Sequence, residues 1–206
     1  MIDAGPPSPP ADGVDGALLA RLAALGEEGG AIWRRFDREV RRVEFHPFVP
    51  ADYERMLQLL LALRAPWLRF LEWGSATGVI TIMADLLGFE AYGIELDPEL
   101  VEIARGLAER FGSGARFAAG SFIPAGYEWK PRTGDARIGT IGQGVSGYAE
   151  LGCALDDFDL VYAYPWDGED PMMHDLLRAR GRPGARLVLA GGAEGVRVYR
   201  GTAREL

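Results

Sequence analysis

Two acidic residues and a turn that contains glycine lie close together in the first half of the chain. Glu72 precedes the segment 74–78, Gly-Ser-Ala-Thr-Gly, and Glu95 follows Gly74 by 21 positions. Glycine lets the backbone turn sharply and approach a ligand, and a helix that starts there directs its N-terminal amides into the same crevice. A carboxylate at the end of the next strand can accept hydrogen bonds from ribose hydroxyls. These residue types in this spacing predict a binding site for a nucleotide cofactor.

The flanking sequence predicts the strand, turn, helix and strand that such a site requires. Residues 69–73 and 91–96 are apolar runs typical of strands buried on both faces. Residues 79–87 lie between them and predict a helix that opens at the turn. Asp97 is expected to cap the next helix, with Pro98 at its first position.

Strands and helices continue to alternate along the rest of the chain, which predicts a parallel sheet built from βαβ units. One further helix is expected at 172–180. The remaining strands are expected at 115–119, 159–164 and 186–190, with one edge strand at 196–200. We therefore expect an α/β fold with a doubly wound, mostly parallel sheet whose C-terminal part is shortened.

Three parts are expected along the chain: a tail at 1–15, a helical segment at 16–65 and a cofactor-binding domain at 66–206. The tail is rich in Pro, Gly and Ala, which predicts disorder. Apolar residues at helical spacing predict three helices in the second part, at 16–25, 31–43 and 51–63. The segment 27–30, Glu-Glu-Gly-Gly, is expected to end the first of them.

The glycine spacing of the turn separates two classes of nucleotide cofactor. The dinucleotide fingerprint G-x-G-x-x-G is broken, because Ala76 replaces its second glycine and Gly78 comes one residue early. Glu72 would also repel a pyrophosphate, whereas it suits a cofactor with a cationic end. At these residues the chain resembles the class I S-adenosylmethionine-dependent methyltransferases, whose first motif reads [Asp/Glu]-x-Gly-x-Gly-x-Gly. Glu72, Gly74 and Gly78 match this motif, and Ala76 replaces the central glycine.

The resemblance covers about residues 64–193 and implies a Rossmann-like fold, S-adenosyl-L-methionine as cofactor and methyl transfer as activity. It implies that Glu72 lies near the methionine amino group and that Glu95 binds the ribose. The other residues expected to contact the cofactor are Gly74, Ser75, Ala76, Gly78, Leu96, Ser121, Phe122 and Tyr164.

Two later segments depart from the family pattern. The third strand of the family usually ends in an Asp that meets adenine, and here Ser121 and Phe122 take its place. Ser121 could accept a hydrogen bond and Phe122 could stack on adenine, or they could be a turn serine and a core phenylalanine. Amino-directed relatives carry [Asp/Asn]-Pro-Pro-[Tyr/Phe/Trp] after the fourth strand. This chain has Ala-Tyr-Pro-Trp at 163–166, so the acid or amide is missing.

Methyl transfer is an in-line displacement that depends on positioning and can proceed without a covalent nucleophile or a metal. If a base takes part, Tyr164 and His46 are the candidate catalytic residues, although His46 could instead pack at a helix entry. An acidic segment that includes Glu169 and Asp170 follows the fourth strand. It could bind a cationic substrate or form a solvated loop.

Composition restricts the partners of the protein. The net charge is −8, and the densest basic stretch, 34–42, is interleaved with acidic residues, so nucleic acid is an unlikely acceptor. A small-molecule or protein methyl acceptor is expected instead. The chain has one cysteine and two distant histidines, which give no metal-site spacing. No signal peptide or membrane-spanning run is recognisable, which predicts a cytoplasmic protein.

Two alternatives concern the end of the chain and the activity. Family members usually finish with two further strands, and only 196–200 is available here, so the sheet could complete itself as a homodimer through its C-terminal edge. The chain could also be a non-catalytic cofactor-binding or partner-binding protein that has the same fold.

Overall fold

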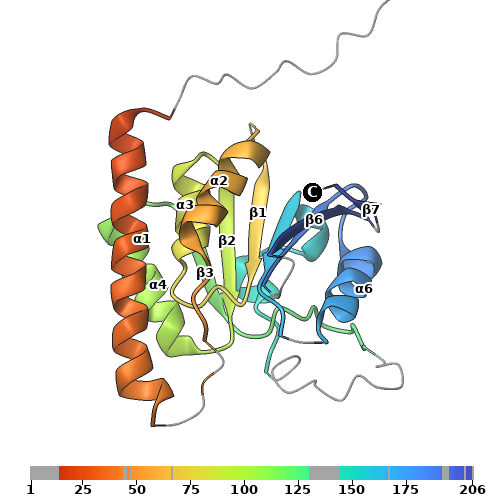
Figure 1. The fold of residues 1–206 in the computed structure, drawn as a ribbon. Coiled ribbons are helices and arrows are strands. Elements are labelled where there is room, and N and C mark those ends of the chain that lie inside the picture. The colour runs from red at the N-terminus through yellow and green to blue at the C-terminus, as the bar shows by residue number, and fades with distance from the viewer. Residues whose placement is uncertain are drawn as a thin grey trace, which may run out of the picture.

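The computed structural model describes residues 14–43, 46, 48–65, 67–129, 144–166, 168–191, 195–201 and 203–205. Within these residues, seven strands form one sheet in the order β3-β2-β1-β4-β5-β6-β7 (Figure 1). The first five strands are parallel, and β6 and β7 continue the sheet in antiparallel fashion. The strands are β1 (Arg69–Trp73), β2 (Glu90–Glu95), β3 (Arg116–Ala119), β4 (Leu160–Ala163), β5 (Arg186–Ala190), β6 (Val196–Arg200) and β7 (Ala203–Arg204).

The strand order reverses between β1 and β4, which both leave their carboxyl ends at the same edge of the sheet. In open α/β sheets the crevice at such a switch point is the usual ligand site. The structure thus confirms the expected α/β fold with a doubly wound, mostly parallel sheet.

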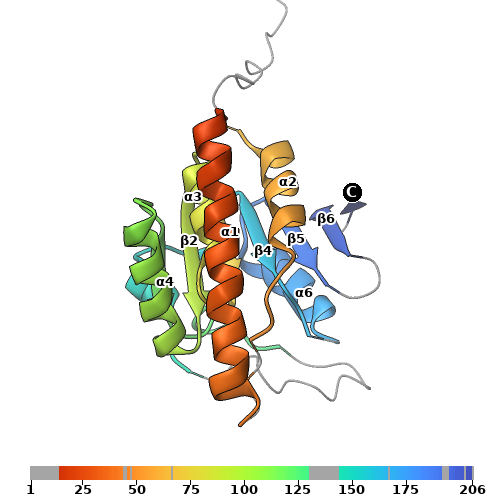
Figure 2. The same ribbon diagram turned by 60° about the vertical axis from the view of Figure 1, so that its left-hand side comes forward.

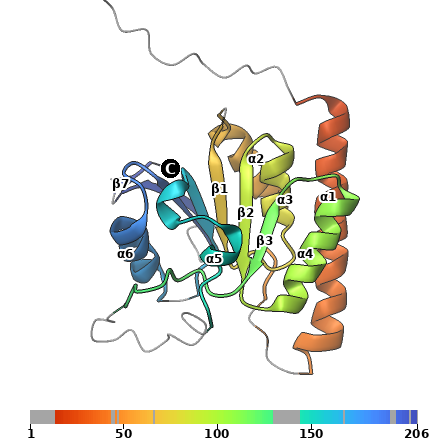
Figure 3. The same cartoon turned by 180° about the vertical axis from the view of Figure 1, so that it is seen from behind.

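Helices cover both faces of the sheet. One face carries α1 (Gly16–Phe36), α2 (Tyr53–Leu63), α3 (Val79–Leu86) and α4 (Pro98–Arg110) around one apolar core (Figure 2). The other face carries α5 (Tyr148–Leu151) and α6 (Asp170–Arg180) around a second core (Figure 3). None of the described helices combines the length and apolar character needed to cross a membrane.

The predicted break at 27–30 is wrong, because α1 passes through it and continues into a π-helical turn at Asp37–Arg41. Gly29 is buried where α1 crosses α3. A Cβ at this position would lie 2.5 Å from Cγ2 of Val79 and 3.2 Å from the Tyr53 ring. Glycine costs a helix about 1 kcal/mol relative to alanine. Here it permits the close approach of α1 to α3, and that packing outweighs the propensity.

The prediction of a single strand after Ala190 is also wrong. β6 pairs with β5 from Val196 to Arg200, as expected, and the two-residue β7 then returns antiparallel to β6. The sheet therefore ends in a short hairpin. The homodimer stays a prediction. Other boundaries differ from the expected ones by one or two residues, as is usual for element ends.

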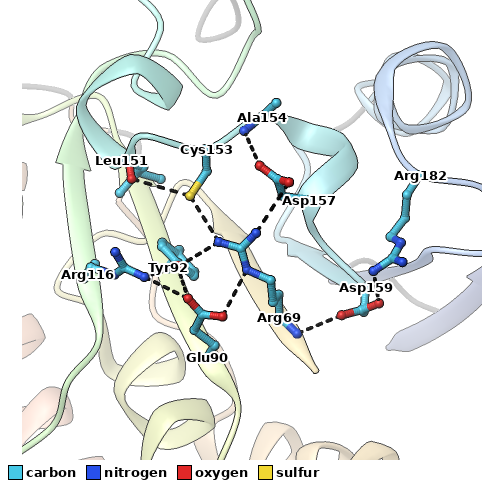
Figure 4. Close-up of polar contacts among 10 residues, drawn as sticks. All are labelled: Arg69, Glu90, Tyr92, Arg116, Leu151, Cys153, Ala154, Asp157, Asp159 and Arg182. Carbon is cyan, nitrogen blue, oxygen red and sulfur yellow. Dashed lines mark hydrogen bonds and ion pairs between the residues drawn. The ribbon is translucent and has the colours of Figure 1, made fainter. Parts of the chain in front are cut away.

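Arg69 organises the edge of the sheet opposite the carboxyl ends (Figure 4). Its Nη2 donates to the Tyr92 hydroxyl at 2.9 Å and to Sγ of Cys153 at 3.2 Å. Its guanidinium also forms ion pairs with Glu90 at 3.1 Å and Asp157 at 3.6 Å. One cation at the start of β1 thus holds the start of β2 and the turn that leads into β4.

Two neighbouring arginines extend this network. Asp159 accepts the backbone N–H of Arg69 at 2.9 Å and pairs with Arg182 at 2.5 Å, which connects β1 to the segment before β5. Arg116, at the start of β3, pairs with Glu90 at 2.8 Å. The amino ends of the parallel strands are therefore joined by side chains as well as by the backbone ladder.

Candidate functional site

The turn after β1 takes the backbone through three left-handed residues. Gly74, Ala76 and Gly78 have φ values of 71°, 45° and 75°. Glycine adopts this conformation at no cost, whereas Ala76 is strained there. A Cβ on Gly78 would lie 2.6 Å from the Phe117 ring, so this glycine serves the packing of α3 against β3. The turn ends at Gly78, the N-cap of α3.

Glu72 lies beneath this turn and is only 4% exposed. Its Oε2 accepts hydrogen bonds from Oγ1 of Thr81 at 2.5 Å and from the Thr81 backbone N–H at 3.0 Å. Burial raises the pKa of Glu72 to about 8, although the two bonds from Thr81 oppose the rise. Glu72 reaches a small cavity of about 30 Å³, whose wall also includes Gly74, Ser75 and Ala76.

Glu95 lies at the end of β2 and faces a larger cavity of about 370 Å³. Its Oε2 accepts the backbone N–H of Ala76 at 2.8 Å, and its Oε1 accepts that of Asp97 at 3.0 Å. Burial raises the pKa of Glu95, and these backbone bonds oppose the rise. A carboxylate can accept about four hydrogen bonds. Glu95 therefore keeps acceptor capacity for a ribose hydroxyl while its orientation is fixed.

Ser121 and Phe122 line the larger cavity after β3. Oγ of Ser121 accepts the N–H of Ile123 at 3.1 Å. The Phe122 ring stacks on Trp73, with centroids 5.1 Å apart and planes 15° apart. One face of Phe122 is thus occupied by the protein, which leaves its edge and other face for a ligand.

Tyr164, Pro165 and Trp166 follow β4 and form another wall of the larger cavity. Tyr164 is 40% exposed and Trp166 is 38% exposed. Tyr164 also lines the smaller cavity, so its side chain lies where the two spaces meet. These two aromatic side chains therefore line the cavity and remain partly accessible to solvent.

His46 lines the larger cavity as well, but both of its ring nitrogens have protein partners. Nε2 lies 3.0 Å from Oδ2 of Asp97, and Nδ1 lies 3.1 Å from the backbone nitrogen of Phe48. The structure therefore brings His46 to the site without offering a ring nitrogen to a substrate.

The predicted residues divide between the two cavities as follows. Gly78 lines neither cavity. Gly74 and Ala76 line both cavities, as Tyr164 does. The larger cavity adds His46, Glu95, Leu96, Ser121 and Phe122, and the smaller adds Glu72 and Ser75.

The larger cavity is also lined by residues that were not predicted as site residues, among them Trp73 and Glu169. Trp73 is buried at the end of β1, and its Nε1 donates to the Tyr148 hydroxyl at 2.9 Å. Glu169 is 5% exposed, and its Oε2 accepts the Trp166 N–H at 2.9 Å, so the solvated loop considered for this residue is wrong. Its place in the sequence could have indicated Trp73 as a site residue, because Trp73 lies between Glu72 and Gly74 of the first motif.

Charges in the lining restrict the ligand. Among the described residues that line the two cavities, none is Lys or Arg. Asp170, next to Glu169, pairs with Arg197 at 2.7 Å. The described part of the chain contains no cluster of three or more His, Cys, Asp or Glu residues able to hold a metal ion. The described lining is thus aromatic and acidic with no basic side chain, which disfavours a pyrophosphate.

Some known proteins are similar to this chain in sequence or in fold. No protein-family model matches the sequence. Over 127 residues, or 61% of the chain, it is 35% identical to a ribosomal protein L11 methyltransferase of Ralstonia nicotianae and 32% identical to that of Ralstonia pickettii. The chain covers only 33% of each of these relatives, about a third of their length.

A solved structure shares the fold. The RNA methyltransferase of Salinibacter ruber in complex with S-adenosyl-L-homocysteine superimposes with a TM-score of 0.52 and 20% identity. The match covers 77% of this chain and 95% of that protein. Together with the strand order, this likeness shows that the chain has the Rossmann-like fold of that methyltransferase.

Proposed function

We propose that the chain binds S-adenosyl-L-methionine in the larger cavity and transfers its methyl group to an acceptor that enters past Tyr164 and Trp166. The observation that carries this proposal is the placement of Glu72 and Glu95, at the ends of adjacent strands, around one left-handed turn. Glu95 is held for a ribose by two backbone amides. Glu72 supplies a carboxyl group for a cationic end.

The cavity also fits the cofactor in size and lining. Its volume of about 370 Å³ lies within the range of about 300–1,000 Å³ typical of small-molecule sites. Aromatic faces attract a sulfonium ion by cation–π interaction, and Trp73, Phe122 and Tyr164 contribute such faces here. Bound S-adenosylmethionine would supply an electrophilic methyl carbon. The residues of this chain would hold the acceptor in line with that carbon and exclude water.

We infer that the acceptor is a protein. The relatives that match this chain are named for methylation of ribosomal protein L11. The described lining of the cavities has no Lys or Arg to bind a polyanion. Tyr164 is our candidate for contact with the acceptor, because its exposed side chain borders both cavities.

Calorimetric titration tests the cofactor. Wild-type protein should bind S-adenosylmethionine and S-adenosylhomocysteine and should not bind NAD. Glu95→Ala should weaken the binding of S-adenosylmethionine and of S-adenosylhomocysteine by about tenfold or more, because hydrogen bonds to a charged group contribute about 1.5–3 kcal/mol. Glu102→Ala, on the exposed face of α4, is the matched control and should bind as wild type. Tighter binding of NAD than of S-adenosylmethionine would refute the proposal.

A second candidate is a binding protein without catalysis, and one observation favours it. Ala163 ends β4 where amino-directed members carry Asp or Asn. Transfer of a radiolabelled methyl group from the cofactor to proteins in a lysate decides between the two. Label that appears with wild type and is lost with Glu95→Ala supports the enzyme. Cofactor binding without label supports the binding protein.

A further inference from the structure

The connection between α1 and α2 forms part of the wall of the cofactor site. We define residues 46 and 48–50 as the strap. Phe48 and Val49 line both cavities, and Phe48 is buried. In Figure 2 this connection descends from α2 toward the edge of the sheet where the strands end. The position of the strap therefore determines the shape of the site.

His46 is the residue that fixes the strap. Its Nδ1 accepts the Phe48 N–H at 3.1 Å, so this nitrogen carries no proton. In a neutral ring the proton then lies on Nε2, which donates to Oδ2 of Asp97 at 3.0 Å. One nitrogen organises the strap, and the other ties it to the Rossmann-like domain. The Phe36 ring packs edge-on against the His46 ring, with centroids 4.8 Å apart, and against the Phe48 ring, with centroids 5.4 Å apart.

Asp97 is itself rigidly placed beside the cofactor residues. Its Oδ1 caps α4 by accepting the Glu99 N–H at 2.8 Å. Its backbone N–H donates to Oε1 of Glu95 at 3.0 Å, and Oε2 of Glu95 holds the Ala76 N–H at 2.8 Å. A continuous series of hydrogen bonds thus connects the strap, through Asp97 and Glu95, to the turn after β1.

We propose that His46 is a positioning residue whose bond to Asp97 holds the strap against the cofactor cavity, so that Phe48 and Val49 enclose the cofactor. This inference rests on the proposed function. It gives His46 a role in cofactor affinity in place of the role of general base, since neither ring nitrogen is open to an acceptor.

Titration with S-adenosylhomocysteine tests this role without turnover. His46→Ala should weaken its binding by about tenfold, because it removes both hydrogen bonds that hold the strap. His46→Gln keeps an N–H that can reach Asp97 but cannot act as a base, so it should restore binding to within about threefold of wild type. His174→Ala is the matched control, because the other histidine packs on Tyr199 with ring centroids 4.5 Å apart and lines neither cavity.

A double-mutant cycle tests the partner. Asp97→Ser retains an N-cap for α4 but removes the carboxylate oxygen that meets His46. If the two side chains act through one bond, the double variant should bind about as weakly as either single variant. Circular dichroism of each variant checks that it is folded.

The outcomes are distinct. If wild type binds no S-adenosylhomocysteine, the proposed function fails and the inference about His46 fails with it. If wild type binds and His46→Ala binds equally well, the inference alone is refuted. It is also refuted if the losses from His46→Ala and Asp97→Ser multiply in the double variant, or if His46→Gln binds as weakly as His46→Ala.

Discussion

The buried carboxyl group of Glu72 makes the stability of the protein depend on pH. Burial raises its pKa from 4.5 to about 8 in the folded state. When the chain unfolds, the group returns to water and its pKa returns to the ordinary value. Between these two values the folded protein keeps a proton that the unfolded chain releases. The contribution of Glu72 to stability is therefore fully present below the unfolded pKa and is lost as pH rises through the folded pKa.

The size of this effect follows from the shift. Each pKa unit corresponds to about 1.4 kcal/mol, so the rise from 4.5 to about 8 corresponds to about 5 kcal/mol over the whole range. Integration over pH places about 3 kcal/mol of this loss between about pH 5 and pH 8. Such a loss is a large part of the about 5–15 kcal/mol by which a typical domain is stabilised against unfolding.

Glu72→Gln removes the titration and keeps the shape of the side chain. Urea unfolding at pH 5 and pH 8, followed by circular dichroism, gives the free energy of unfolding for both proteins. The difference between wild type and Glu72→Gln should shift by about 3 kcal/mol in favour of the variant as pH rises. Glu102→Gln, on the exposed face of α4, should show no such shift. Equal pH dependence of wild type and Glu72→Gln would refute the reasoning.

Two further predictions concern backbone conformation and packing. Ala76 has a φ of 45°, so Ala76→Gly should raise the free energy of unfolding by about 1 kcal/mol in urea titration; a fall would show that the turn is unstrained. Gly29→Ala places a Cβ 2.5 Å from Cγ2 of Val79 and should lower stability by about 1–3 kcal/mol. Gly16→Ala, with nothing within 4 Å of its Cβ, should not destabilise α1; equal effects of the two changes would refute the contact.

Local sequence signals were sufficient for the turn and for the sheet up to β6, whereas the two-residue β7 was not predicted. β1, β5 and β6 have the expected bounds, because each is a short apolar or alternating run between turn residues. The turn after β1 combines glycine with an acidic residue at each of two strand ends, a pattern typical of nucleotide-binding βαβ units.

Long-range contacts account for what could not be predicted. The continuation of α1 through Gly29 depends on its contact with α3, and helix propensities do not account for such long-range contacts. The sequence around Glu169 is compatible with a solvated acidic loop. In the structure Glu169 is buried in the cavity wall, because it directly precedes α6. His46 and Asp97 are 51 positions apart, so their contact depends on how the fold places the strap beside the start of α4.

The Arg69 network has a consequence for how this chain can change. It joins the amino ends of the strands, whereas the larger cavity is lined by the strap and by segments at the carboxyl ends of the strands. The two edges are separated by the length of a strand, about 17–20 Å for five or six residues. Substitutions around the cavity leave the Arg69 network unchanged. Ligand specificity can therefore diverge while the pairing of the strands is conserved.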